Sequence, residues 1–196
     1  MTDKANGLPI TNISHKEYFV IATHRYPRRG IGLPNWRVLD STSESEYAQG
    51  LIVSAYINDI TKNIVINFDY LGKLAIEKPQ FDKIVQTAAV FSSNIKNYAM
   101  LNIYKVSHTG YGYGGIIAAE CALRDRFPAV IFESPEMPFK NYLPPHMTDS
   151  NIVTFVSKAN ADPENYYGNV YHVELYPNAD KELLARWEKA RQQHAE

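Results

Sequence analysis

A chain of 196 residues, 45% of them hydrophobic and 21% charged, has the size and composition of one ordinary globular domain. Its 20 basic and 21 acidic residues leave a formal net charge of -1, which provides no field to concentrate nucleic acid, so nucleic-acid binding is disfavoured. The single cysteine, Cys121, excludes an intramolecular disulfide and a cysteine-based zinc site, and it favours a reducing compartment.

No segment has the pattern of a targeting sequence or a membrane span. The first ten residues mix charged, amide, glycine and proline residues, without an apolar run that could serve as a signal peptide. No stretch approaches the roughly 18 apolar residues of a transmembrane helix. The sequence therefore predicts a cytoplasmic protein with one domain over 1–196 and a flexible N-terminus over 1–13. Secretion without a signal peptide stays open as an alternative.

The first half of the chain predicts a helix followed by an antiparallel hairpin. Residues Lys16–Tyr26 are apolar enough for a buried helix or strand, and the helix is favoured, with Ser14 as its N-cap. Trp36–Leu39 predicts a short strand. The clearest hairpin joins Leu51–Ile57 to Ile64–Phe68, because both runs are rich in β-branched and aromatic residues and polar turn residues separate them.

The second half predicts alternating helices and strands. Apolar residues recur at helical spacing over Phe81–Ile95. The elements expected after it are a strand at Leu101–Val106, a turn at Ser107–Gly115, a helix at Ile116–Arg126, strands at Ala129–Phe132, Ile152–Val156 and Val170–Leu175, and a charged helix at Lys181–Gln193. This alternation indicates an α/β domain with a mostly parallel sheet flanked by helices, preceded by the N-terminal antiparallel hairpin.

The densest motif is the glycine-rich run Thr-Gly-Tyr-Gly-Tyr-Gly-Gly over Thr109–Gly115, between a predicted strand and a predicted helix. Glycine serves such a turn in two ways, since it accepts positive φ and lets the strand and helix backbones pass closely. The simplest interpretation is a tight turn without chemistry. Two functional interpretations compete with it.

The first is a nucleophile elbow, because Gly110-x-Gly112-x-Gly114 has the spacing of Gly-x-Ser-x-Gly. The run resembles the Thr-Gly-His-Ser-Leu-Gly-Gly of class 3 lipases, with Tyr111, Gly112 and Tyr113 in place of His, Ser and Leu. Weaker matches follow in order along the chain: Trp36–Val38, Ala55–Asn58 and Ile64–Phe68 with the family's first strands, Ser134-Pro135 with its Gly-Ser-Pro, and Asn160–Pro163 with its Asn-Asp-Pro.

This resemblance implies a lipase-like α/β hydrolase that needs neither a cofactor nor a metal and binds a small acyl or lipid-like ligand. It places Gly112 at the nucleophile position, Asp162 as the acid, and His172 or His194 as the base. Both histidines also have ordinary explanations, as a strand residue and as part of a C-terminal tail. The remaining implied residues are Tyr113 and Leu71 at the oxyanion site and Gly110, Gly114 and Gly115 in the elbow.

The departures from the family fall on the atoms that perform its chemistry. Gly112 has no side chain with which to attack an ester. Phe68-Asp69-Tyr70-Leu71 replaces the family's Phe-Arg-Gly-Thr, so Asp69 brings a carboxylate to the place where negative charge would develop. We therefore expect an inactive protein: either a natural pseudoenzyme kept as a binding module, for a ligand or a protein partner, or a hydrolase whose serine was substituted.

The second interpretation is dinucleotide binding through Gly110-x-Gly112-x-x-Gly115. That fingerprint requires an acidic residue about 20 positions later, at the end of the next strand, and Glu133 meets the requirement. Against it, the fingerprint normally opens its domain, whereas about half of this chain precedes it. The lipase-like interpretation is therefore favoured.

Several other residues are predicted to lie near the turn. His108 immediately precedes it and could reach its mouth, whereas Ser107 should point along the strand and away from the apex. Tyrosines typical of binding surfaces, and equally typical of sheets, are expected around the rim: Tyr111, Tyr113, Tyr142, Tyr166, Tyr167 and Tyr171.

Overall fold

The computed structural model describes residues 12–24, 31–42, 50–72, 77–136, 151–157 and 162–172. The helices are α1 (His15–Ala22), α2 (Lys78–Asn102), α3 (Tyr113–Asp125) and the short 3-10 helix η4 (Pro163–Asn165). The strands are β1 (Trp36–Ser41), β2 (Leu51–Asn58), β3 (Asn63–Tyr70), β4 (Lys105–Tyr111), β5 (Ala129–Phe132), β6 (Ile152–Val156) and β7 (Asn169–His172). The predictions for residues 1–11, Tyr142, the helix Lys181–Gln193 and His194 lie outside the described residues.

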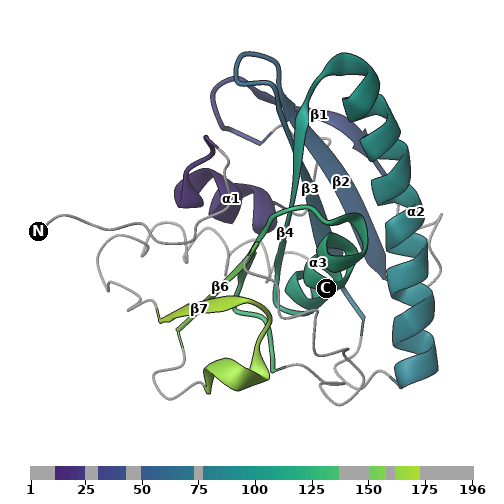
Figure 1. Ribbon diagram of the computed structural model, residues 1–196, viewed down its shortest axis with the longest axis vertical. Coiled ribbons are helices and arrows are strands. Elements are labelled where there is room, and N and C mark those ends of the chain that lie inside the picture. The colour runs from purple at the N-terminus through teal and green to yellow at the C-terminus, as the bar shows by residue number, and fades with distance from the viewer. Residues whose placement is uncertain are drawn as a thin grey trace, which may run out of the picture.

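The seven strands form one sheet in the order of the sequence, β1 to β7. The pairs β1–β2 and β2–β3 are antiparallel, and every pair from β3 to β7 is parallel. This confirms the predicted α/β fold with a mostly parallel sheet and an antiparallel hairpin before it (Figure 1).

Helices cover both faces of the sheet because its central strands are apolar on both sides. Along β3, Ile64, Ile66 and Phe68 face α2 and α3 and join the larger hydrophobic core. The intervening Val65 faces α1 and belongs to a second core with Tyr18. Both faces of β3 are therefore buried, as expected for a central strand of an α/β sheet.

The predicted helix and its cap Ser14 are confirmed, but α1 ends at Ala22, four residues before the predicted end. The Ser14 hydroxyl accepts a hydrogen bond from the backbone N–H of Glu17 at 3.2 Å, and the Glu17 carboxylate accepts one from the backbone N–H of Ser14 at 2.9 Å. This reciprocal pair is a capping box. The same carboxylate accepts a hydrogen bond from the indole N–H of Trp36 at 2.9 Å, which fixes α1 to β1.

The predicted strand Leu101–Val106 begins too early. Leu101 is still in α2, which continues to Asn102, and β4 begins at Lys105. Buried Ile95 and Ala99 extend the apolar face of the helix, while Leu101 is largely exposed on its opposite side. An apolar residue at a helix end was thus interpreted as the start of a strand.

The predicted turn Ser107–Gly115 is much shorter in the structure. β4 continues to Tyr111, where it pairs with Phe132 of β5, and α3 begins at Tyr113. The polar residues of this run are strand residues whose hydrogen bonds are internal: the Thr109 hydroxyl donates to the carbonyl oxygen of Val130 at 2.6 Å. Only Gly112 separates the strand from the helix.

The parallel strands define two edges of the sheet. The carboxyl edge is where β3 to β7 end and where α2 and α3 begin, and it contains Gly112. The amino edge is where these strands begin and where α2 and α3 end. Among the described residues, no helix has both the length and the apolar character to cross a membrane.

Candidate functional site

The elbow between β4 and α3 is built on an unusual backbone conformation at Gly112. Its φ of 59° and ψ of -130° lie outside the regions that residues with a side chain readily adopt. The backbone N–H of Gly112 donates to the carbonyl oxygen of Phe132 at 3.0 Å, and its own carbonyl accepts from the backbone N–H of Gly115 at 3.0 Å. Among the described residues, none has an atom within 4 Å of a Cβ atom built at position 112, apart from its two chain neighbours. The elbow therefore presents position 112 to open space.

The neighbouring glycines Gly110, Gly114 and Gly115 allow close packing between α3 and the strands. A Cβ atom at Gly110 would overlap the carbonyl oxygen of Gly114, and one at Gly114 would overlap the carbonyl oxygen of Phe68. A Cβ atom at Gly115 would lie 3.2 Å from the Cβ atom of Ser134. These glycines allow the first turn of α3 to lie against the ends of β3, β4 and β5.

The segment at the end of β3 lies beside the start of α3. A Cβ atom at Gly114 would be 3.2 Å from the Cα atom of Asp69, whose side chain is buried. The backbone N–H of Leu71, a predicted oxyanion donor, donates instead to the carbonyl oxygen of Gly50 at 2.8 Å. In this conformation the amide of Leu71 is therefore already engaged within the fold.

Asp162, the predicted acid, lies on the connection between the end of β6 and the start of β7. Its side chain is exposed, and its Oδ1 accepts a hydrogen bond from the backbone N–H of Glu164 at 3.0 Å. Asp162 is thus the N-cap of η4. This interaction gives Asp162 a structural role that needs no catalytic partner.

His172, one of the two predicted bases, is the last residue of β7 and pairs with Val156 of β6. β7 lies three strand spacings from β4, which is roughly 14 Å at about 4.8 Å per spacing. This separation exceeds the combined reach of a histidine side chain and a serine side chain at position 112. The described structure therefore places His172 and Gly112 on the same edge without bringing them together.

Solved structures share this architecture. A lipase from Rhizopus microsporus var. chinensis superposes with a TM-score of 0.50 at 13% identity, over 80% of this chain and 72% of the lipase. A further fungal lipase superposes with a TM-score of 0.52 at 13% identity, over 74% of this chain and 72% of that one. No family model matches the sequence, and no curated protein matches it.

The chain has a lipase-like α/β fold. Because both identities are low, this likeness concerns the fold alone. Within the lipase-like fold, the strand-to-helix turn that contains Gly112 has the position of the elbow that the sequence motif predicts.

A second group of residues, which sequence reasoning did not identify, lies inside the lipase-like fold and away from the elbow. The Ser92 hydroxyl of α2 donates to Asp125 Oδ2 of α3 at 2.6 Å and lies 3.1 Å from His108 Nε2 of β4. Since the hydroxyl proton is directed at the carboxylate, Nε2–H of His108 is the donor to Ser92 Oγ. Ser92, His108 and Asp125 therefore form a polar network between two helices and the sheet.

The prediction that His108 could reach the mouth of the turn is wrong. Its side chain is fully buried between the rings of Phe68 and Phe127, at centroid distances of 5.2 and 5.5 Å. Burial lowers the pKa of His108 to about 4, although the carboxylate of Asp125 opposes the shift. Ser107 points to the other face of the sheet, where its hydroxyl accepts from Tyr18 at 2.7 Å.

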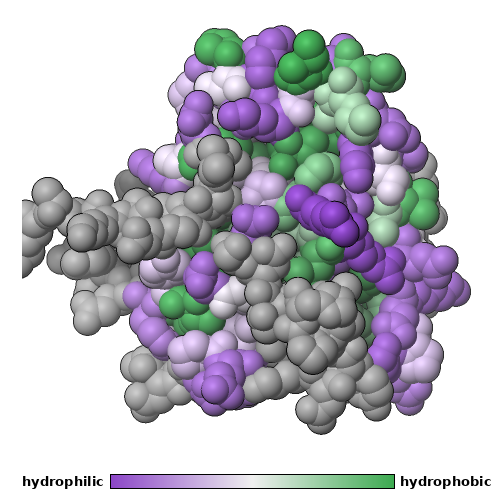
Figure 2. All heavy atoms as spheres, viewed as in Figure 1, coloured by the Kyte–Doolittle hydropathy of each residue, from purple (hydrophilic) through white to green (hydrophobic). Residues whose placement is uncertain are grey.

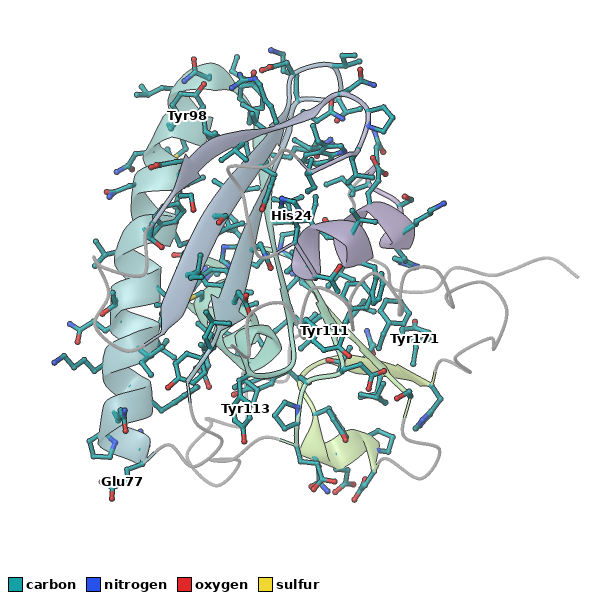
Figure 3. The ribbon with its side chains drawn as sticks, turned by 180° about the vertical axis from the view of Figure 1, so that it is seen from behind. His24, Glu77, Tyr98, Tyr111, Tyr113 and Tyr171 are labelled. Carbon is teal, nitrogen blue, oxygen red and sulfur yellow. The ribbon has the colours of Figure 1, made fainter. Side chains whose placement is uncertain are left out.

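The tyrosines predicted for the rim divide into two groups. Tyr111 and Tyr113 flank Gly112 at the carboxyl edge, and Tyr171 lies on β7 at the same end (Figure 3). The ring of Tyr113 lies 6.5 Å from that of Tyr70, and the ring of Tyr171 lies 5.7 Å from that of Phe155. Tyr166 and Tyr167 are buried instead and belong to the core.

Glu133 lies directly after β5, where the dinucleotide interpretation expects its acidic residue, and it adopts a positive φ of 48°. Its carboxylate accepts a hydrogen bond from the Ser157 hydroxyl at 2.9 Å. Dinucleotides bind α/β sheets where the strand order reverses. From β3 to β7 the strand order follows the sequence without a reversal, so the described sheet has no such switch point beside Gly112.

Proposed function

We propose that this chain is a lipase-like α/β hydrolase domain that no longer hydrolyses esters and that uses the carboxyl edge of its sheet to bind a small acyl ligand. The observation that supports it most directly is Gly112. The elbow presents position 112 to open space at the end of β4, but glycine has no atom with which to attack a carbonyl carbon.

The backbone of the elbow supports loss of the nucleophile rather than its relocation to a neighbour. Tyr111 and Tyr113 adjoin Gly112, but a phenol with a pKa near 10 needs a strong base to become a nucleophile. The Ser134 hydroxyl, the serine nearest to Gly115, is buried against the start of α3 and so is not presented to a substrate.

The surroundings of the elbow also favour binding over turnover. The amide of Leu71 is bonded to Gly50, and the carboxylate of Asp69 follows Phe68 at the end of β3. A tetrahedral intermediate needs donors aimed at its oxyanion, and a nearby carboxylate destabilises it. A neutral acyl ligand develops no such charge and is compatible with both features.

Hydrolysis of short-chain p-nitrophenyl esters tests the loss of activity, with Gly112→Ala as the matched control. We expect the unaltered chain, Gly112→Ala and a heat-denatured sample to release nitrophenol at the same rate, because none has a nucleophile at the elbow. Turnover by the unaltered chain that a serine-reactive phosphonate inhibits would overturn this part of the proposal.

Calorimetry with a short-chain acyl ester tests the binding part. We expect saturable binding that weakens in Tyr113→Ala, since Tyr113 adjoins Gly112, and that is unchanged in Val90→Ala, an exposed change in the middle of α2. Equal binding by both variants would place the ligand elsewhere.

A further inference from the structure

The amino edge of the sheet, opposite to the elbow, exposes an unusual amount of apolar surface. Among the described residues, the four most exposed large hydrophobic side chains all lie there: Ile60 at 74%, Met100 at 71%, Leu101 at 85% and Ile103 at 86%. Ile60 is in the turn between β2 and β3, and the other three are at the end of α2. Figure 2 shows hydrophobic side chains gathered at this end, at the top of the view.

These two segments lie against one another. The Tyr104 hydroxyl, just after α2, donates to Asp59 Oδ1 at 2.6 Å, and the backbone N–H of Lys105 donates to the carbonyl oxygen of Lys62 at 2.9 Å. The ring of Tyr98 stacks on that of Tyr104 at 6.3 Å. The exposed hydrophobic side chains of both segments therefore lie at one end of the molecule, and we call them together the apolar tip: Ile60, Tyr98, Met100, Leu101 and Ile103.

Ile103 is held in a conformation that does not suit it. It ends α2 in the left-handed region, with φ of 59° and ψ of 49°, where glycine or asparagine is usual and a β-branched residue is strained. Its side chain is 86% exposed, so packing within this chain does not explain the isoleucine. Contact with an apolar surface outside this chain would explain an isoleucine at this position.

The charge around the apolar tip identifies what kind of surface it meets. Six basic residues of the described chain lie at or near the amino edge, against three acidic residues, Asp59, Glu120 and Asp125, of which Asp59 pairs with Arg37. The six are Arg37, Lys62, Lys96, Lys105, Arg124 and Arg126. The formal net charge of -1 therefore conceals a basic end of the molecule.

The opposite end is acidic. Five acidic residues of the described chain lie at the carboxyl edge, against two lysines. The acidic residues are Asp69, Glu77, Asp82, Glu133 and Glu136, and the lysines are Lys78 and Lys83. A negatively charged surface thus attracts the amino edge and repels the carboxyl edge, which orients the molecule.

We propose that the amino edge binds the surface of an anionic lipid bilayer. The apolar tip enters the boundary between headgroups and acyl chains, and the lysines and arginines around it contact the anionic headgroups. Tyr98 and Tyr104 then lie at headgroup level, where tyrosine is enriched. A second copy bound through the same edge is disfavoured, because a symmetric contact would bring the two basic edges together. This binding is independent of the proposed function, since the elbow faces away from the bilayer.

Flotation with lipid vesicles tests the proposal. We expect the chain to float with vesicles that mix phosphatidylcholine with phosphatidylserine, and not with phosphatidylcholine alone, and the bound fraction should fall as salt is raised. Absence of binding to the anionic vesicles at low salt would overturn the proposal, as would equal binding to both kinds of vesicle.

Paired variants separate the apolar and the charged contributions. Ile103→Asn combined with Leu101→Ser should lower the partition coefficient at least about tenfold, while Val90→Ser, an exposed change in the middle of α2, should leave it unchanged. Asparagine suits the left-handed position 103, so unfolding does not explain a loss. Lys105→Gln should weaken binding about fivefold and Lys83→Gln, at the other end of α2, should not weaken it.

Two outcomes would contradict this assignment. Equal effects of Lys105→Gln and Lys83→Gln would show that the edge is not the contact. A concentration-dependent dimer without lipid, abolished by Leu101→Ser, would assign the apolar tip to a second copy of the chain.

Discussion

The backbone N–H of Leu71 donates a hydrogen bond of 2.8 Å to the carbonyl oxygen of Gly50. This bond fixes the loop after β3 to the start of β2, and it occupies the amide that the lipase resemblance assigns to oxyanion binding. On the proposed function, Gly112 is therefore the first of three departures from a working hydrolase at this edge, with the engaged amide of Leu71 and the carboxylate of Asp69. A serine at position 112 would restore only the missing hydroxyl.

Gly112→Ser should accordingly produce little esterase activity. We expect kcat/KM for a short p-nitrophenyl ester to rise no more than about tenfold, because loss of a single oxyanion donor alone lowers kcat by about 10²–10³. A gain of several orders of magnitude would contradict this expectation. It would indicate that His172 or His194 acts as a base with Asp162 and that the loop at Leu71 rearranges.

Alanine substitutions should distinguish the two kinds of glycine in the elbow. Gly112→Ala should lower the free energy of unfolding by about 1–3 kcal/mol, because only the backbone conformation opposes a side chain there. Gly114→Ala should cost more, since its Cβ atom would overlap the carbonyl oxygen of Phe68. Denaturant unfolding measures both, and a smaller loss for Gly114→Ala would contradict the packing argument.

The buried imidazole of His108 should make the protein less stable in mild acid. Its folded pKa of about 4 is below the ordinary value of 6.5, so the unfolded chain binds a proton that the folded chain does not. The contribution of neutral His108 to the free energy of unfolding is fully present above pH 6.5. It decreases by up to about 3 kcal/mol as the pH falls toward 4. Unfolding by denaturant between pH 7.5 and pH 4.5 measures it.

His108→Gln is the control for that pH dependence. Glutamine retains a donor toward Ser92 but does not titrate, so the variant should be less stable at pH 7.5 and lose less stability on acidification. The same loss in the variant as in the unaltered chain would show that other groups cause the acid sensitivity.

Dinucleotides should not bind. Calorimetry with NAD and with FAD should give no saturable heat, because the described strands show no reversal of order beside Gly112 and Glu133 already accepts a hydrogen bond from Ser157. Micromolar binding that disappears in Glu133→Ala would support the alternative interpretation of the glycine-rich run.

Local patterns in the sequence were sufficient for most of the fold. The strand β5 was predicted with its observed ends, and Ser14 was identified as the cap of α1, because apolar runs and capping residues act over short distances. The junctions on either side of β4 could not be predicted from local patterns. Leu101 is apolar yet exposed, and Thr109 is polar yet satisfied by Val130 of the neighbouring strand, which only the folded sheet reveals.

The site was predictable only in part, for a related reason. The elbow follows from glycine spacing, whereas the network of Ser92, His108 and Asp125 joins three elements with no motif in common. Likewise, the engagement of Leu71 depends on Gly50, which precedes it by 21 positions. Contacts between distant segments leave no local pattern.

Covalent labelling with a fluorophosphonate probe, followed by mass spectrometry of the modified peptide, tests most directly whether the elbow contains an activated nucleophile. The unaltered chain should acquire no adduct, because Gly112 offers no hydroxyl and the phenols of Tyr111 and Tyr113 have no base to activate them. A stoichiometric adduct on any residue of Thr109–Gly115 or on Ser134, abolished by denaturation, would contradict the loss of the hydrolase site.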